Sequence, residues 1–321
     1  MCDCGNLKFL KKHRFSFPEI KEYDNSIGEL IYEHERLCIL FEKILRHKIP
    51  AEFEINLCTS CGIIFSNPRF TTEEIKTKYK VASELEADKK RHGQIMSLVR
   101  YRKHAKYIHL LITRLYGNIT KSLEVLDYGG AEGYNLSPFA ETDNTCYLLD
   151  YIKYNRVKGV KYAGKDMQDL PSDKIFDIIL LCNILEHAIE PQQLLKSLSS
   201  HLSESGLLYV EVPFGCWTEW KGIKEPLTHI NFFSEESLFK SFRNAGLNVI
   251  YLSTAFQQKH QGKTWCLNIV GSKRKGHALT KFKTTRQQME NPYYYLKPFM
   301  NNPRDYLIRA AKKILRILRK K

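Results

Sequence analysis

The chain has 321 residues, of which 43% are hydrophobic and 26% are charged, so it is long enough for one full α/β domain with smaller additions at either end. It has no run of about 18 apolar residues and no secretory signal pattern, which argues against membrane spanning and export. Its nine cysteines are an odd number and favour a reducing cytoplasm over a disulfide framework. The formal net charge of +15 favours an anionic partner, which leaves nucleic acid, a phosphorylated small molecule or an acidic membrane surface open.

The first region, residues 1–79, is predicted to be a small zinc-ribbon-like module. It is punctuated by cysteines and only weakly periodic, and it closes with the turn-forming Ser66-Asn67-Pro68. The polar segment that follows predicts a helix beginning at Thr72.

Two thiols of this region have the spacing of a metal knuckle. In Cys58-Thr-Ser-Cys61-Gly62, two thiolates can bind one ion while the glycine relieves the turn. Cys2 and Cys4 are the candidate partner pair, one residue shorter than a usual knuckle. We therefore predict a structural zinc site of Cys2, Cys4, Cys58 and Cys61. Two alternatives stay open: Cys38 or His13 supplies a ligand, or no zinc binds.

Residues 80–117 are predicted to be a helical connector. From about Glu84 to Tyr116, apolar residues recur at helical spacing, and arginine and lysine side chains lie between them. The apolar set is Ile95, Leu98, Val99, Ile108, Leu111, Ile112 and Leu115. Gly117 is a typical helix stop, so the helix is predicted to end there.

Residues 118–275 alternate short apolar runs with amphipathic segments. The runs are Leu123–Tyr128, Cys146–Asp150, Val160–Ala163, Phe176–Cys182, Leu207–Val212, Leu247–Leu252 and Trp265–Val270. Segments between them, such as Pro191–Leu202 and Ser234–Ala245, are long enough for crossover helices. This alternation predicts an α/β domain: a Rossmann-like, seven-stranded, mostly parallel sheet with helices on both faces.

The C-terminal extension, residues 276–321, is predicted to contain a basic amphipathic helix from about Asn302. Leucine, isoleucine and alanine recur at helical spacing with lysine and arginine between them. Two roles stay open for it: packing on its own domain through the apolar stripe, or peripheral contact with an anionic membrane. Nucleic acid ranks below both.

A glycine-rich turn follows the first of the seven runs. Leu123 to Gly133 reads as an apolar strand that enters Gly129-Gly130-Ala131-Glu132-Gly133 and then a helix. Glycines let the backbone approach a ligand closely, because a Cβ would collide with it. Such a turn lies at the carboxyl ends of parallel strands, where ligands bind.

Polar residues also follow the next strands in order. Asp150 ends the second strand, where a carboxylate can accept hydrogen bonds from both ribose hydroxyls. Asp166 and Met167 follow the third strand, and Asn183 follows the fourth. Because each stands where the sheet gives way to a loop, these residues are predicted to converge.

Across roughly Leu123 to Val270, the sequence resembles the class I S-adenosylmethionine-dependent methyltransferases. It matches the order of acidic residue, glycine turn, second acidic residue, aspartate before adenine and Leu-Glu-His turn, although Ala131 stands where the middle glycine is usual. The resemblance implies S-adenosylmethionine as cofactor and assigns roles around it. Gly129 and Gly133 contact its methionine end with Gly130, Asp127 holds the glycine turn or the amino group, Asp150 binds the ribose, Asp166 with Met167 binds the adenine, and Asn183 completes the site.

Two histidines are candidates for a catalytic base. Methyl transfer displaces an already activated carbon, so the protein mainly aligns the acceptor and removes a proton where needed. His187 ends the Leu-Glu-His turn, and His229 precedes Asn231-Phe-Phe-Ser234. A role in shaping the pocket stays open for His187. Histidine loops of the second kind, and a cysteine module like residues 1–79, resemble the sugar C-methyltransferase branch, which implies His229 as the base.

The predicted function is methyl transfer to a small molecule, a nucleotide- or lipid-linked sugar of surface polysaccharide synthesis, by a cytoplasmic enzyme. One alternative is an RNA or protein methyltransferase that uses the positive charge. Against methylation of base nitrogens, Asn183 is followed by Ile184 and Leu185 rather than by a double proline. A second alternative is a non-catalytic cofactor-binding or scaffold protein.

Overall fold

The computed structural model describes residues 5–15, 36–45, 50–91, 98–117, 122–151, 153, 157–214, 221, 223, 226–259 and 262–274. Its strands are β1 Leu7–Phe15, β2 Ala51–Cys58, β3 Ile64–Asn67, β4 Glu124–Tyr128, β5 Thr145–Leu149, β6 Lys161–Gly164, β7 Phe176–Cys182, β8 Leu202–Pro213, β9 Asn231–Phe232, β10 Asn248–Lys259 and β11 Gly262–Ser272. Its α-helices are α2 Thr72–Arg91, α3 Leu98–Tyr116, α4 Ser137–Ala140, α5 Pro191–Ser200 and α6 Glu235–Asn244. Short helical turns lie at Ile39–Ile44, Tyr134–Leu136, Met167–Asp169 and Leu185–His187.

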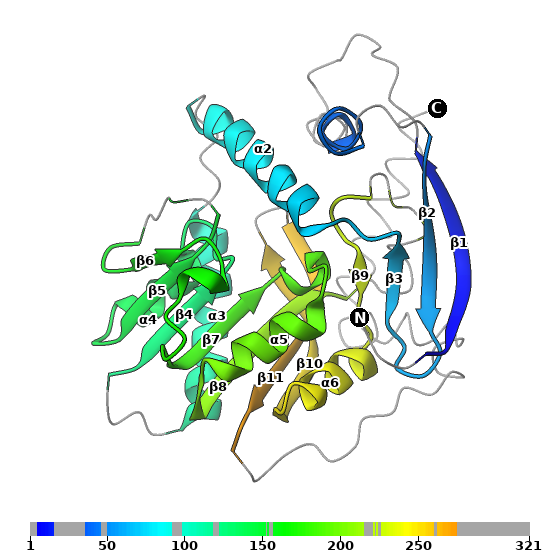
Figure 1. The fold of residues 1–321 in the computed structure, drawn as a ribbon. Helices are drawn as coiled ribbons and strands as arrows, with labels where there is room; N and C mark the ends of the chain where they lie inside the picture. Colours follow the sequence, from blue (N-terminus) through cyan, green and yellow to red (C-terminus); the bar gives the residue numbers. More distant parts are fainter. Residues whose placement is uncertain are drawn as a thin grey trace, which may run out of the picture.

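The larger sheet has seven strands in the order β10-β11-β8-β7-β4-β5-β6 (Figure 1). Strands β6, β5, β4, β7 and β8 pair in parallel, and β11 pairs antiparallel with both β8 and β10. The α/β prediction of a seven-stranded, mostly parallel sheet is therefore confirmed. The chain leaves β4 for β5 and β6 and then returns to β7 on the other side of β4, so the strand order reverses at β4, where ligands bind in such sheets.

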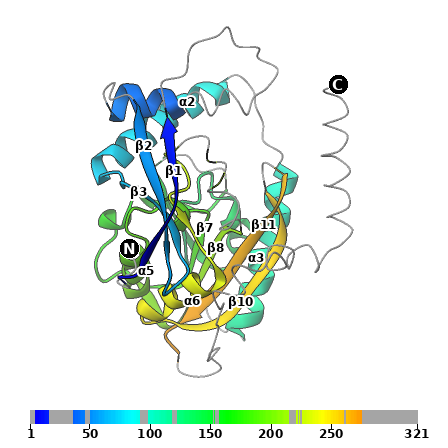
Figure 2. The same cartoon turned by 90° about the vertical axis from the view of Figure 1, so that its right-hand side faces the viewer.

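Helices cover both faces of this sheet, as predicted, and the 90° view separates α5 from α3 across the strands (Figure 2). On one face, Ile108 and Ile112 of α3 pack on a buried layer that includes Val125 and Leu180. On the other face, α5 and α6 contribute Leu195, Leu198, Leu238 and Phe242. Burial on both faces explains why the central strands are nearly continuous apolar runs, as in Phe176–Cys182.

Local signals set the ends of several helices. Ser234 accepts a hydrogen bond from the Ser237 N–H and caps α6, and Glu235 and Glu236 follow in its first turn. Pro191 begins α5, where its missing N–H costs nothing. The predicted helix starts at Thr72 and Ser234 and the stop at Gly117 agree with the structure to within a residue.

Three strands are longer than their apolar runs. β8 begins at Leu202 rather than at Leu207, and it takes the last residue of the predicted helix Pro191–Leu202. β10 and β11 extend into an antiparallel hairpin, whose pairing runs from Asn248↔Ser272 to Lys259↔Gly262. The polar end of this hairpin has no apolar periodicity, so the sequence pattern does not reveal it.

A second sheet joins the N-terminal region to the larger domain. Its order is β1-β2-β3-β9, so three N-terminal strands share a sheet with β9, which follows residue 230 and pairs with β3. Buried Cys58, Cys61, Ile63 and Phe65 share one apolar cluster with the seven-stranded sheet. Helix α2 runs from Thr72 to Arg91 and so crosses the predicted boundary at residue 79.

The predicted amphipathic tail lies outside the described residues, which end at residue 274. Among the residues that are described, no helix has both the length and the apolar character needed to cross a bilayer.

Candidate cofactor and catalytic site

The glycine-rich turn after β4 has the left-handed backbone that its glycines allow. Gly129 and Gly133 have φ of +71° and +80°, and Ala131 has φ of +50°. Alanine therefore keeps the conformation expected of the usual middle glycine, at a backbone cost of about 1 kcal/mol. The departure from the family pattern at Ala131 leaves the turn intact.

Two glycines of this turn have no room for a side chain. A Cβ on Gly129 would lie 2.2 Å from Ile184 Cδ1, and a Cβ on Gly130 would lie 2.2 Å from Asp127 Oδ2. The glycine turn is thus packed against the loop that follows β7 and against Asp127 near the end of β4. These contacts explain the glycines physically and bring Ile184, which the sequence pattern does not single out, to the site.

Asp127 is fully buried beneath the turn. Neither of its carboxylate oxygens has a partner at full hydrogen-bond geometry among the described residues, although the Asn135 amide interacts with the carboxylate. Burial raises the pKa of Asp127 to about 7, the nearby Asn135 amide lowers it in part, and the Asp150 charge raises it further. A buried carboxylate beside a glycine turn fits a ligand with a positive charge, such as the ammonium group of S-adenosylmethionine.

Asp150 connects the end of β5 to the same turn. Its Oδ2 accepts a hydrogen bond from the Ala131 N–H at 2.8 Å, and its own N–H donates to the Gly164 carbonyl at 3.0 Å. The Gly129 N–H donates to the Leu149 carbonyl at 2.7 Å. The ends of β4, β5 and β6 are therefore held in register, and Asp150 lies beside the glycine turn as predicted.

Asp166 and Met167 lie at the end of β6. The Asp166 carboxylate accepts from the Gln168 N–H at 2.9 Å and caps the short turn Met167–Asp169. Met167 is partly buried against the core of the sheet. Asp166 thus has a local structural role in addition to the adenine contact that the resemblance implies.

A group of tyrosines lies around Asp150 and Asp166. Tyr79 of α2 stacks on Tyr151, with ring centroids 5.0 Å apart. Burial, with Glu186, Tyr151, Tyr128 and Asp150 nearby, raises the pKa of Tyr79. The sequence pattern misses Tyr79 because it comes from the N-terminal region, far from the other site residues in sequence.

Asn183 lies in a loop that is bonded to β8. It has φ of +55°, and its N–H donates to the Glu211 carbonyl at 2.8 Å. Buried Glu211 also accepts from the Tyr209 hydroxyl at 2.9 Å and lies 3.0 Å from His104 Nε2. This network anchors the loop that begins at Asn183 to helix α3. Apolar periodicity in the sequence does not reveal the network.

The two predicted histidines lie together at the loops after β7 and before β9, with ring centroids 5.0 Å apart. His187 Nδ1 lies 2.6 Å from the Thr228 carbonyl oxygen. Burial, Lys78 and His229 lower the pKa of His187 well below its ordinary value. Buried Glu186 lies next to them, its Oε1 3.6 Å from His187 Nε2. The Leu-Glu-His pattern contains Glu186, but its spacing alone predicts no role for this carboxylate.

The predicted knuckle forms the turn between β2 and β3. The Gly62 N–H donates to the Cys58 carbonyl at 2.8 Å, and Cys58 and Cys61 are buried. Asn6 Nδ2 donates to Ser60 Oγ at 3.1 Å, so the chain just after Cys4 lies against this turn. Cys2 and Cys4 themselves lie outside the described residues.

The two alternative zinc ligands lie elsewhere. His13 pairs with Phe53 on β2, whereas Leu7 pairs with Cys58, so His13 is roughly 20 Å along the strand from the knuckle. The short helix after Cys38 packs with Ala51 and Phe53 at the opposite end of β2. The structure therefore contradicts the alternative that His13 or Cys38 supplies a ligand.

Comparisons with known proteins agree on one domain type. Residues 99–252 match the family model described as a methyltransferase domain. Over 116 residues, the chain is 30% identical to the ubiquinone biosynthesis O-methyltransferase of Rickettsia felis, covering 33% of this chain and 47% of that protein. The Rickettsia akari protein of the same name is 28% identical, with 33% and 46% covered. The chain thus spans about half the length of the curated relatives it matches.

Similarity to solved structures is found at lower sequence identity. The 1,6-didemethyltoxoflavin-N1-methyltransferase of Burkholderia thailandensis is 15% identical with a TM-score of 0.49, covering 71% of this chain and 99% of that chain. An S-adenosylmethionine-dependent methyltransferase from Clostridium acetobutylicum is 13% identical with a TM-score of 0.42, covering 54% and 91%.

Proposed function

We propose that the chain transfers a methyl group from S-adenosylmethionine to a small-molecule acceptor, a proposal supported by the match of residues 99–252 to the methyltransferase-domain family model. The observation that carries the proposal is the buried Asp127 carboxylate, without a partner at full hydrogen-bond geometry among the described residues, beneath a turn whose glycines cannot bear a side chain. This arrangement suits a ligand that brings its own positive charge close to the backbone.

The chain's own residues divide the binding of the cofactor among three strand ends. Asp127 attracts the ammonium group, and Gly129, Gly130 and Gly133 let the backbone approach the methionine end. Asp150 binds the ribose hydroxyls while its Oδ2 also holds the Ala131 N–H. Asp166 with Met167 faces the adenine, and Asn183 closes the site from the β7 side. When bound, S-adenosylmethionine supplies a methyl group activated by a positive sulfur.

His229 is our proposed base for the acceptor proton. It lies beside His187, whose Nδ1 is bound to the Thr228 carbonyl, so His187 is suited to fixing the loop that carries His229. Burial also disfavours a protonated His187, since its pKa is lowered. These contacts support the proposed division into base and positioning residue.

We propose a hydroxyl of a small molecule as the acceptor. Support comes from the two curated relatives, which are named as O-methyltransferases. The nucleotide- or lipid-linked sugar remains a prediction for which the comparisons give no support. No specific observation supports methylation of RNA or protein. The cytoplasmic location and the contact of residues 276–321 with an anionic membrane also remain proposals.

We further propose that Cys58 and Cys61, with Cys2 and Cys4, bind one structural zinc ion. The knuckle turn of Cys58 and the contacts of Asn6 to the same turn support this, because they bring the chain that follows Cys4 to the two thiols. Thiolates in this spacing are typical zinc ligands, and such an ion would stabilise the turn without taking part in catalysis.

The test is cofactor binding by thermal shift. Saturating S-adenosylhomocysteine should raise the Tm of the chain by roughly 5 °C. Asp150→Asn should lose most of this rise, because an amide can still accept from the Ala131 N–H but binds two ribose hydroxyls poorly. Asp143→Asn, at an exposed carboxylate, is the matched control and should keep the full shift. No shift in the wild-type chain would contradict the proposed cofactor.

Turnover is then measured with radiolabelled S-adenosylmethionine and a panel of phenols and nucleotide sugars. Label should pass to a hydroxyl-bearing compound, and His229→Gln should bind the cofactor normally while losing most of the transfer rate. Cofactor binding without transfer to any compound or cell-extract fraction would favour the scaffold alternative.

A further inference from the structure

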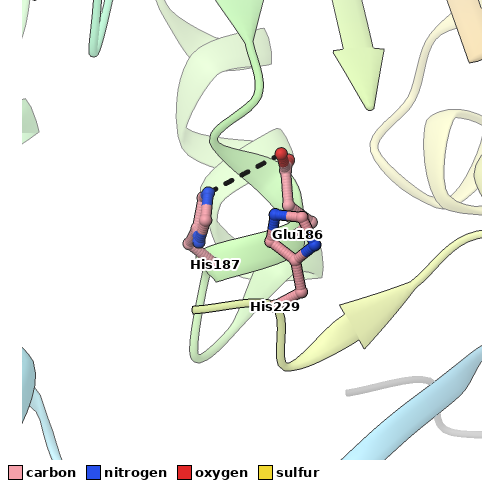
Figure 3. Close-up of side chains that lie close together, drawn as sticks. All are labelled: Glu186, His187 and His229. Carbon is pink, nitrogen blue, oxygen red and sulfur yellow. Dashed lines mark ion pairs between the residues drawn. The ribbon is translucent and has the colours of Figure 1, made fainter. Parts of the chain in front are cut away.

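We propose that Glu186, His187 and His229 form a binding site for a divalent transition-metal cation. Their ligand atoms all lie within 4.8 Å of one another, and the three side chains point toward a common centre from two neighbouring loops (Figure 3). Two imidazoles and one carboxylate are a donor set that Zn²⁺, Mn²⁺, Fe²⁺ and Co²⁺ accept. Three protein ligands also leave positions open for a further ligand.

The hydrogen bond of His187 fixes which of its nitrogens can bind a cation. Nδ1 lies 2.6 Å from the Thr228 carbonyl oxygen, and a carbonyl oxygen only accepts, so Nδ1 carries the hydrogen. The lone pair of the neutral ring then lies on Nε2. A carbonyl bonded to the other ring nitrogen is the usual outer support of a metal-binding histidine.

The lone pair on Nε2 of His187 faces the carboxylate of Glu186. Nε2 lies 3.6 Å from Glu186 Oε1, so an acceptor nitrogen and a carboxylate oxygen face each other inside the protein. Two ligands of one metal ion at about 2.1 Å are roughly 3 to 3.5 Å apart, which is close to this spacing. A cation between the two atoms would therefore replace a repulsive contact with two bonds.

The two loops that carry the ligands are bound to each other before any ion arrives. The Ile230 N–H donates to the Glu186 carbonyl at 3.0 Å, and Asn231 Nδ2 donates to the Ala188 carbonyl at 2.7 Å. Lys78 Nζ donates to the Leu227 carbonyl at 2.7 Å. Ligands held in place in this way lose little entropy on binding a cation.

The charges around the site set the expected strength of binding. Arg36 donates to the Thr228 hydroxyl, and Lys78 of α2 donates to the Leu227 carbonyl of the same loop, so two positive groups oppose a dication while Glu186 attracts it. We therefore expect a dissociation constant roughly in the micromolar range rather than tight structural binding.

The Glu186 loop begins beside the glycine turn, because Ile184 lies against Gly129. With an ion bound, His229 donates its lone pair to the cation and does not act as the proposed base. A role of the ion in methyl transfer would therefore replace that role and rests on the proposed function, whereas cation binding itself does not.

The experiment is a titration of the purified full chain with Mn²⁺, following free Mn²⁺ by electron paramagnetic resonance. Mn²⁺ prefers nitrogen and oxygen ligands, so the thiols of the Cys58 turn contribute little. Metal content of the purified chain is measured by mass spectrometry alongside, in case an ion already occupies the site. We expect one such site per chain. Glu186→Gln and His229→Gln should each weaken Mn²⁺ at least about tenfold or remove the resident ion.

The control is His109→Gln, which changes a partly buried histidine on α3 that packs edge-on to Phe139 and should leave metal binding unchanged. Thermal unfolding of each variant checks that it is folded. The proposal would be overturned if the wild-type chain holds no ion and binds no Mn²⁺. Unchanged Mn²⁺ binding in both site variants would overturn it as well. The two histidines would then have only the roles of base and positioning residue. The S-adenosylhomocysteine shift, measured on the same samples, tests the methyltransferase proposal separately.

Discussion

Asp127 shows how a single residue can trade stability for binding. Its position near the carboxyl end of an apolar run, Leu123–Tyr128, predicts from the sequence alone that it lies at the ligand end of the sheet. Its complete burial and the absence of a partner at full hydrogen-bond geometry among the described residues follow only from tertiary packing, because Gly130 and Leu148 close over it. Periodicity could therefore predict the location of Asp127 but not its altered pKa.

The altered pKa gives Asp127 a pH-dependent cost that substitution should remove. Its pKa is about 7 in the folded chain against 3.8 ordinarily, so the native state binds the proton more tightly and the free energy of unfolding falls as pH rises between these values. Asp127→Asn should match the wild-type stability near pH 4 and exceed it by about 4 kcal/mol at pH 8, while binding S-adenosylmethionine more weakly. Urea unfolding across this pH range measures the difference.

A matched control for this prediction is Asp177→Asn. Asp177 is also buried, but it accepts from the Glu124 N–H at 3.1 Å and the Ser203 hydroxyl at 3.2 Å. Its substitution should destabilise the chain rather than stabilise it at pH 8. Parallel pH profiles for wild type and Asp127→Asn would show that burial does not penalise this carboxylate.

At the scale of elements, sequence patterns located the strands of the larger sheet because the central ones, such as β7, are buried runs of apolar residues. They failed at elements whose pairing is set by distant segments. β9 has only two residues and exists as a strand because β3 lies beside it, and β10 and β11 continue through polar residues because each completes the other's hydrogen bonds. Pairing of this kind has no local signature.

The β2–β3 turn makes a prediction at this scale. If Cys58 and Cys61 bind zinc with Cys2 and Cys4, mass spectrometry should find about one zinc per chain in addition to any ion at Glu186. Cys58→Ser should lose this zinc, whereas Cys146→Ser, at a buried thiol of β5, should keep it. A folded wild-type chain without zinc would leave the knuckle as a turn stabilised by hydrogen bonds only.

At the scale of the whole molecule, the structure packs residues 1–79 together with the larger domain, although the sequence pattern separates them. The sequence pattern of residues 1–79 predicts a separate module, because the cysteines and weak periodicity of this region end where a regular helical pattern begins. The structure shows Phe65 and Ile63 of this region in one apolar cluster with Leu126, Ile179 and Phe233. Arg69 links it further, since its guanidinium donates to the Ile189 carbonyl at 2.6 Å and to Asn231. Such contacts between distant segments cannot be read from composition.

These shared contacts predict that the N-terminal sheet and the domain of the seven-stranded sheet unfold together. Phe65 is 1% exposed, and Phe65→Ala should lower the free energy of unfolding by about 3 to 5 kcal/mol. The loss should appear as one cooperative transition, at the same temperature by circular dichroism and by loss of S-adenosylhomocysteine binding. Phe9→Ala, at a side chain on β1 that is 55% exposed, should change little. If the Phe65 variant instead melts in two steps and cofactor binding persists to the wild-type temperature, the two regions are independent after all.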